Sequence, residues 1–146
     1  MKNFASIDIG SNTVRLLILE SGGAGDFQLL ASRRVITRLG EGMDTHGKRL
    51  ESRMSEASSA LSGFRQDCMD HGNPPLFAVA TSAVREASNG KEFVRLAREK
   101  TGIEIEIIPW EEEARLTLEG VFWKIPHENR KSLTLDIGGG STEFIL

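Results

Sequence analysis

The sequence has little of several features that would each indicate a particular class of protein. It contains a single cysteine, Cys68, so no disulfide forms within the chain, as is typical of proteins from a reducing compartment. It has no run of about 18 apolar residues, and its N-terminus lacks the hydrophobic segment of a signal peptide. We therefore expect a cytoplasmic protein that does not contact a membrane.

The sequence also has no excess of positive charge. Lysine and arginine number 18 against 21 aspartates and glutamates, and the net charge is −3, so a general nucleic-acid-binding surface is not expected. An anionic ligand would have to be bound by local donors. The three histidines, His46, His71 and His127, fall in predicted loops without metal-ligand spacing, and we expect them to be solvated.

A polar turn near the N-terminus separates two apolar segments that we predict to be strands, 6–9 and 14–19. The turn, Gly10-Ser11-Asn12-Thr13, combines residues that tolerate unusual backbone angles with hydroxyl groups. Such a turn exposes several N–H groups and is suited to bind phosphate, although alone it also fits an ordinary β-hairpin. Asp8 precedes it and is better placed to position a metal ion or a water than to touch an anion.

The same design recurs at the other end of the chain. A predicted strand ends in Asp136-Ile137-Gly138, the small residues Gly139-Gly140-Ser141 follow, and a second apolar segment contains Glu143. Two phosphate-type turns of one pattern predict two related lobes that face one anionic ligand.

Between these turns, helices and strands alternate. We predict a bulged third strand over 27–39, a glycine-rich loop over 39–47 that is either a mobile connection or a lip over the ligand, and a helix over 51–71. A strand covered on both faces (76–80), a helix to Thr101 and a half-exposed strand (103–108) follow. The buried stripe of the first helix is predicted to comprise Met54, Ala57, Leu61, Phe64 and Cys68.

Local signals mark both later helices. Asn89 is predicted to cap the second helix with Glu92 as its capping-box partner, and Phe93, Leu96 and Ala97 are expected to face inward. The third helix spans about 110–123. Its first-turn glutamates, which include Glu113, are explained by the helix dipole, and its expected packing face comprises Ala114, Leu118, Val121 and Phe122.

Arg85 follows the 76–80 strand and the hydroxyl pair Thr81-Ser82, at the end of the strand where α/β sheets bind ligands. Two interpretations stay open for it: a surface arginine paired with Glu86, or a contact to the anion.

The element order predicts an α/β fold with a ribonuclease-H-like mixed five-stranded sheet and helices on both faces. We expect residues 1–125 to form this first lobe. Residues 126–146 would then form a linker and the first two strands of an incomplete second lobe.

The repeated Asp-Ile-Gly turn resembles that of the actin, Hsp70 and sugar-kinase superfamily, with its actin-like ATPase domain. More narrowly, five segments occur in the order of the exopolyphosphatase and guanosine pentaphosphate phosphohydrolase family. They are Asp8–Thr13, Arg38–Gly42, Ala80–Arg85, Glu112–Leu116 and Asp136–Glu143.

This resemblance implies hydrolysis of a terminal phosphoanhydride bond in polyphosphate or guanosine pentaphosphate, with Mg²⁺. It implies Glu113 as the acid that activates water. The phosphate-contacting residues that it implies are Ser11, Asn12, Arg85, Gly138, Gly139 and Ser141, and the acids beside a divalent ion are Asp8, Asp136 and Glu143.

The chain is shorter than the family it resembles, so we expect either a fragment of a longer enzyme that is inactive alone or a protein that has lost its second lobe. A non-catalytic phosphate- or nucleotide-binding lobe is the alternative. An ATP-dependent kinase of the same superfamily is disfavoured, because kinase-like members usually have a pattern other than Ser11-Asn12 in the first turn. The unpaired edges of the last strands would also allow a homodimer.

Overall fold

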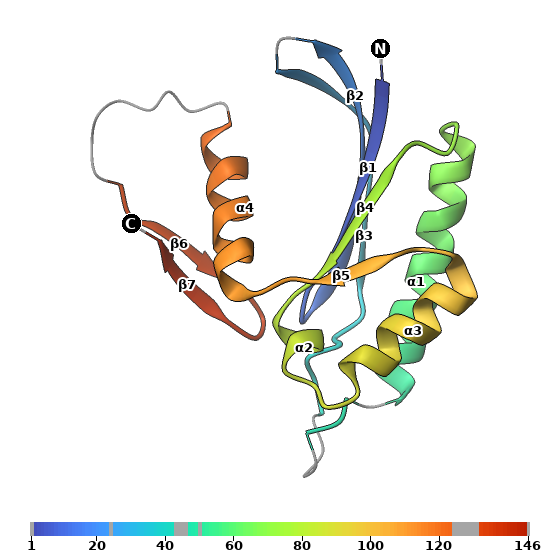
Figure 1. Ribbon diagram of the computed structural model, residues 1–146, viewed down its shortest axis with the longest axis vertical. Coiled ribbons are helices and arrows are strands. Elements are labelled where there is room, and N and C mark those ends of the chain that lie inside the picture. The colour runs from blue at the N-terminus through green and yellow to red at the C-terminus, as the bar shows by residue number, and fades with distance from the viewer. Residues whose placement is uncertain (1, 24, 43–46, 50, 124–131, 146) are drawn as a thin grey trace.

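A computed structural model describes residues 2–23, 25–42, 47–49, 51–123 and 132–145. A five-stranded sheet in the order β3-β2-β1-β4-β5 forms its centre (Figure 1). Its first three strands are antiparallel, and β4 and β5 run parallel to β1. The strands are β1 (Lys2–Ile9), β2 (Thr13–Gly23), β3 (Asp26–Ile36), β4 (Leu76–Ala80) and β5 (Ile105–Ile107).

In the described parts of the chain, four helices and a separate two-stranded sheet accompany the large sheet. The helices are α1 (Glu51–Asp70), α2 (Ser82–Arg85), α3 (Gly90–Thr101) and α4 (Trp110–Phe122). The small sheet pairs β6 (Thr134–Ile137) with β7 (Thr142–Ile145) in antiparallel register. The mixed five-stranded sheet is therefore the one predicted from the order of the elements. The predicted lobe boundary at 125–126 and part of the 39–47 loop lie outside the described residues.

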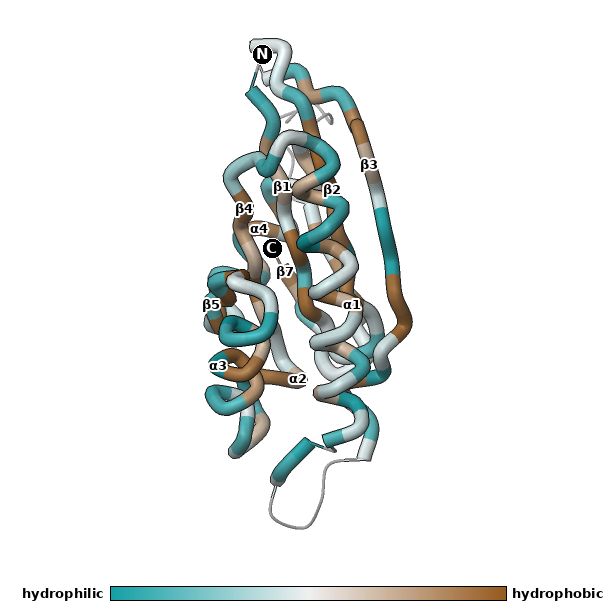
Figure 2. Tube along the Cα trace, turned by 90° about the vertical axis from the view of Figure 1, so that its right-hand side faces the viewer, coloured by the Kyte–Doolittle hydropathy of each residue, from teal (hydrophilic) through white to brown (hydrophobic). Residues whose placement is uncertain are grey.

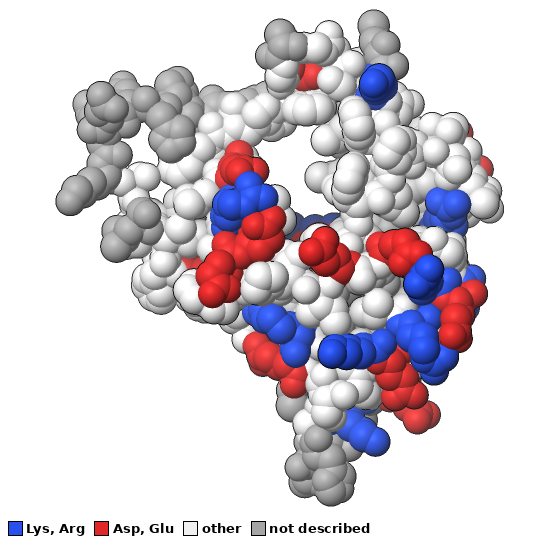
Figure 3. All heavy atoms as spheres, in the orientation of Figure 1, with Lys and Arg blue, Asp and Glu red and all other residues white. Residues whose placement is uncertain are grey.

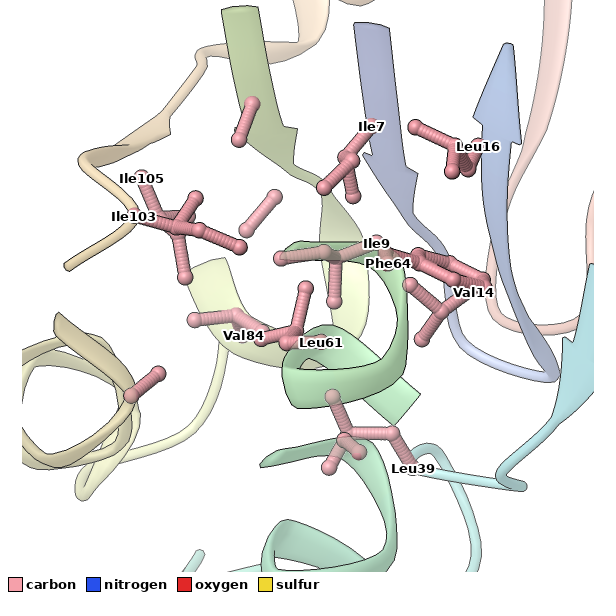
Figure 4. Packing of buried hydrophobic residues seen from close by; sticks show 14 of the residues in the cluster. Ile7, Ile9, Val14, Leu16, Leu39, Leu61, Phe64, Val84, Ile103 and Ile105 are labelled. Atoms are coloured by element: carbon pink, nitrogen blue, oxygen red, sulfur yellow. The ribbon is translucent and has the colours of Figure 1, made fainter. Parts of the chain in front are cut away.

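One face of the large sheet carries the hydrophobic core. Alternate side chains of β1 and β2 are buried there, and α1 and α3 cover this face (Figure 2). Figure 4 shows Leu61 and Phe64 of α1 among the isoleucines and leucines of the strands. All five residues of the predicted α1 stripe are buried, namely Met54, Ala57, Leu61, Phe64 and Cys68. The period of 3.6 residues in the sequence was sufficient to identify this face.

The opposite face of the sheet is open. Helix α4 lies on this side, away from α1 and α3, and the molecule is hollowed between α4 and the strands (Figures 1 and 3). None of the α4 residues is buried, and Val121 is 42% exposed, so the predicted packing face of this helix is not a core face in the described structure. Phe77 of β4 is 64% exposed, and the prediction that this strand is covered on both faces was wrong.

Three further local predictions differ from the structure. Leu96 is 42% exposed, although its neighbours Phe93 and Ala97 on α3 are buried. Asn89 precedes α3 without capping it through its side chain, because that side chain bonds Arg49. His71 is half-buried and its ring lies 2.7 Å from the Asp67 carbonyl oxygen, so it is not freely solvated. His46 and His127 lie outside the described residues.

The bulge expected in the third strand is present, because the β2–β3 register shifts between Ile18 and Leu19. Among the described helices, none is long and apolar enough to cross a membrane.

Candidate phosphate-binding site

A pocket of about 450 Å³ lies where the C-terminal ends of β1 and β4 meet the small sheet. It brings together residues from both ends of the sequence. The predicted site residues that line it are Asp8, Ser11, Asn12, Glu113, Asp136, Gly138, Gly139 and Ser141. Two predicted residues, Arg85 and Glu143, do not line it.

Backbone hydrogen bonds fix the first turn, which connects β1 to β2. The Gly10 amide donates to the Thr13 carbonyl oxygen at 3.0 Å. The Asn12 carbonyl oxygen accepts from the amides of Thr37 and Arg38 at 3.1 and 3.0 Å, so the segment after β3 braces the turn. The Ser11 hydroxyl lies 2.9 Å from that of Ser82, and both serines are buried. The turn is thus held in one conformation, as an anion site requires.

The second turn packs directly against the first. It is closed by the Gly138 amide, which donates to the Ser141 carbonyl oxygen at 2.9 Å. A Cβ atom added at Gly139 would lie 3.2 Å from Cβ of Asn12, and one added at Gly140 would lie 2.5 Å from Oγ of Ser11. The missing side chains therefore allow the two backbones to approach, and the polar groups of both turns face one space.

Glu113 lies in the first turn of α4 and forms an ion pair with Arg85. The Oε2 atom of Glu113 lies 2.9 Å from Nη1 of Arg85. The same arginine nitrogen donates to the Ile108 carbonyl oxygen at 3.0 Å, which anchors the guanidinium. Both side chains are mostly shielded from water. The predicted ion pair of Arg85 with Glu86 was wrong, because Arg85 pairs with Glu113. Arg85 does not line the pocket itself, but its partner Glu113 does.

The surroundings of Asp8 in this pocket change its pKa. Desolvation by the surrounding protein raises the pKa of Asp8, and the negative charges of Glu113 and Asp136 raise it further, against a lowering effect of Arg15. Solvent reaches Asp8 through the open pocket and screens these interactions. Asp136 accepts a hydrogen bond from the Thr117 hydroxyl at 3.1 Å.

Two of the acids predicted to bind a divalent ion, Asp8 and Asp136, line the pocket. Among the described residues, no group of three or more His, Cys, Asp or Glu side chains could hold a metal ion by itself. Mg²⁺ usually takes only one or two carboxylates, with water and substrate phosphates completing its octahedron. Asp8 and Asp136 would supply that number of carboxylates. Glu143 stands opposite Asp136 in the β6–β7 register but does not line the pocket.

Several pocket residues were not predicted from the sequence as site residues. Ser82 and Thr81 were noticed only as neighbours of Arg85, although hydroxyls at the end of a parallel strand are themselves a signal. Arg15 and Arg34 are cross-strand partners on the open face of the sheet. The only sequence signal for Arg15 was its place on the polar side of an alternating strand.

The sequence and the fold both resemble those of known proteins. Residues 17–146 match the Ppx/GppA phosphatase family. The chain is 35% identical over 137 residues to proteins named exopolyphosphatase 1 from Mycobacterium bovis and Mycobacterium tuberculosis, a match that covers 94% of this chain and 40% of theirs. The chain thus spans about 40% of the length of the curated relatives it matches.

Solved structures agree with these matches. An exopolyphosphatase from Cytophaga hutchinsonii superposes with a TM-score of 0.93 at 35% identity, over 99% of this chain and 46% of that one. The type II variant of the Aquifex aeolicus Ppx/GppA phosphatase superposes with a TM-score of 0.83 at 32% identity, over 99% of this chain and 47% of that one. On these matches and on its actin-like fold, the chain belongs to the Ppx/GppA phosphatase family.

Proposed function

We propose that this chain supplies the first lobe, and the start of the second, of a phosphohydrolase. The enzyme would remove the terminal phosphate of inorganic polyphosphate, of guanosine pentaphosphate, or of both. The observation that carries the proposal is the close approach of the two Asp-Ile-Gly turns across one pocket, with Glu113 at its edge. The names of the mycobacterial and Cytophaga relatives support polyphosphate as substrate.

The proposed chemistry needs three contributions from the protein. Backbone N–H groups and hydroxyls of both turns, including those of Ser11 and Ser141, would bind the oxygens of the terminal phosphate. Glu113 would accept a proton from the attacking water, for which it has to come within hydrogen-bond reach of that water. Arg85 would hold the Glu113 carboxylate in place through their ion pair.

Charge balance favours a cation in the reaction. The pocket contains the carboxylates of Asp8, Glu113 and Asp136 beside the guanidinium groups of Arg15 and Arg34, while the substrate is strongly anionic. Mg²⁺ held by Asp8 and Asp136 would neutralise charge that develops on the phosphate oxygens.

The test compares two substrates and two matched variants. Orthophosphate release by the 146-residue chain is measured with Mg²⁺ from long-chain polyphosphate and from guanosine pentaphosphate, for wild type, Glu113→Gln and Glu112→Gln. Loss of the base lowers turnover by about 10²–10⁴-fold in Glu113→Gln. Glu112 pairs with Arg115 on the exposed surface of α4, so Glu112→Gln retains activity.

A second measurement separates the alternatives. Calorimetric titration of Glu113→Gln with tripolyphosphate reports binding without turnover. Release of phosphate from only one substrate identifies that substrate. Binding by this chain without release favours a non-catalytic phosphate-binding lobe if a chain with the complete second lobe also releases no phosphate, and neither release nor binding would overturn the proposal.

A further inference from the structure

Arg49 is a buried cation that lies outside the phosphate pocket. It stands in the segment before α1 and is 9% exposed. Its Nε donates to the Ala83 carbonyl oxygen at 2.9 Å, and its Nη1 donates to the Gly40 carbonyl oxygen at 2.7 Å. The guanidinium thereby joins the segment after β3 to helix α2, which are distant in the sequence. Two main-chain acceptors suit its planar, forked donor geometry.

Asn89 fixes the main chain of Arg49 in turn. Its Oδ1 accepts from the Arg49 amide at 2.9 Å, and its Nδ2 donates to the Arg49 carbonyl oxygen at 3.1 Å. This double contact explains why Asn89 does not cap α3 through its side chain. Asn89 and Arg49 are both buried, so the bonds between them are shielded from competition with water.

Both segments held by Arg49 lead directly to Ser11. The Gly40 amide donates to the Ser11 carbonyl oxygen at 2.6 Å, and a Cβ atom added at Gly40 would lie 3.0 Å from Cβ of Ser11. Ala83 follows Ser82, whose hydroxyl lies 2.9 Å from that of Ser11. Ser11 is therefore held through its main chain by one segment and through its side chain by the other.

We propose that Arg49 is a positioning residue for the phosphate pocket. It acts through Gly40 and Ala83 on the two hydroxyl groups of Ser11 and Ser82, and Asn89 holds it in place. Loss of its guanidinium leaves the half-buried Gly40 carbonyl oxygen and the buried Ala83 carbonyl oxygen without this donor, and it releases both segments behind the turn. The effect on phosphate binding rests on the proposed function, whereas the effect on the turn itself does not.

Amide hydrogen exchange measured by NMR tests the effect on the turn without any ligand. In Arg49→Met we expect the Gly40 amide to exchange at least about tenfold faster relative to the Ala5 amide, which bonds the Pro75 carbonyl oxygen. Phe64→Leu weakens the core elsewhere and changes both amides by a similar factor. Arg49→Lys keeps a single donor group and gives an intermediate ratio of Gly40 to Ala5 exchange.

A second variant covers the case in which Arg49→Met does not fold. Asn89→Ala then replaces it. An unchanged ratio of Gly40 to Ala5 exchange overturns the proposal.

Calorimetric titration with tripolyphosphate tests the effect on binding. Arg49→Met is expected to bind about tenfold more weakly than wild type, because a small displacement of the donors is costly, while Phe64→Leu binds normally. Equal affinity of Arg49→Met and wild type would overturn a role in the pocket. If wild type does not bind tripolyphosphate, the proposed function fails, and the exchange ratio alone decides whether Arg49 positions the turn.

Discussion

Arg85 of α2 and Glu113 of α4 form an ion pair with 2.9 Å between Nη1 and Oε2. The two residues come from helices that α3 and β5 separate in the sequence. The Arg85 side chain is 23% exposed and the Glu113 side chain is 16% exposed. It links the end of β4, where α2 begins, to the helix that carries the proposed base. The carboxylate is thereby fixed at the edge of the pocket before any ligand binds.

The first prediction concerns the energy of this pair. A double-mutant cycle of Arg85→Met and Glu113→Gln, measured by urea unfolding, is expected to give a coupling free energy of about 0.5–3 kcal/mol. The mostly exposed pair of Arg98 and Glu104 is the matched control, for which about 0–1 kcal/mol is expected. Coupling at Arg85 no larger than in the control would mean that the pair does not fix Glu113.

The second prediction uses the close approach of the two turns. In Gly140→Ala the new Cβ atom would lie 2.5 Å from Oγ of Ser11 and 2.7 Å from Oγ of Ser82, so either the second turn or the two hydroxyl groups have to move. Tripolyphosphate binding should weaken by about tenfold or more. Gly120→Ala, in open space on α4, is expected to keep binding and to stabilise the fold by about 0.5–1 kcal/mol. Undiminished binding in Gly140→Ala would contradict a site shared by both turns.

The third prediction concerns the Ser82 hydroxyl, which faces the pocket and its Ser11 neighbour. Ser82→Ala is expected to weaken tripolyphosphate binding by about fivefold, the equivalent of one hydrogen bond of about 1 kcal/mol. Ser62→Ala removes a hydroxyl that bonds the Ser58 carbonyl oxygen within α1 and should leave binding unchanged. Affinity is measured by calorimetric titration, and equal values for the two variants would exclude a contribution from Ser82.

The fourth prediction concerns pH. Because desolvation by the surrounding protein and two neighbouring acids raise the pKa of Asp8, the folded state binds this proton more tightly than the unfolded state. The contribution of Asp8 to stability therefore declines as the pH rises from its ordinary pKa of 3.8 through its raised value in the folded protein. Asp8→Asn removes this decline, so its melting temperature should exceed that of wild type above this range and approach it in acid. Thermal unfolding from about pH 3 to about pH 8 tests this, and parallel curves would contradict it.

Local chemistry in the sequence was sufficient to locate much of the site. The repeated Asp-Ile-Gly turns are recognisable because each needs small and hydroxyl-bearing residues at fixed positions after a strand. The turns contribute most of the pocket lining, from Asp8 to Ser141. The family resemblance added Glu113, which the position of three acids in a helix start could not single out. The catalytic, phosphate-binding and metal-binding roles of these residues stay predictions.

Packing patterns likewise determined the sheet and α1. The burial of Leu61 and Phe64 follows from the helical period, and the alternation along β1 and β2 defines which side of the sheet meets α1. These patterns are local, because the period of a helix or strand by itself determines to which side each of its side chains points.

Only the tertiary structure decided the partners of polar side chains. Arg85 had Glu86 beside it in sequence but pairs with Glu113, and Asn89 bonds Arg49 although a capping partner stood three residues away. Both choices depend on contacts between segments 28 and 40 residues apart. Such contacts form only when the sheet has placed those segments together, so neither propensity nor spacing encodes them.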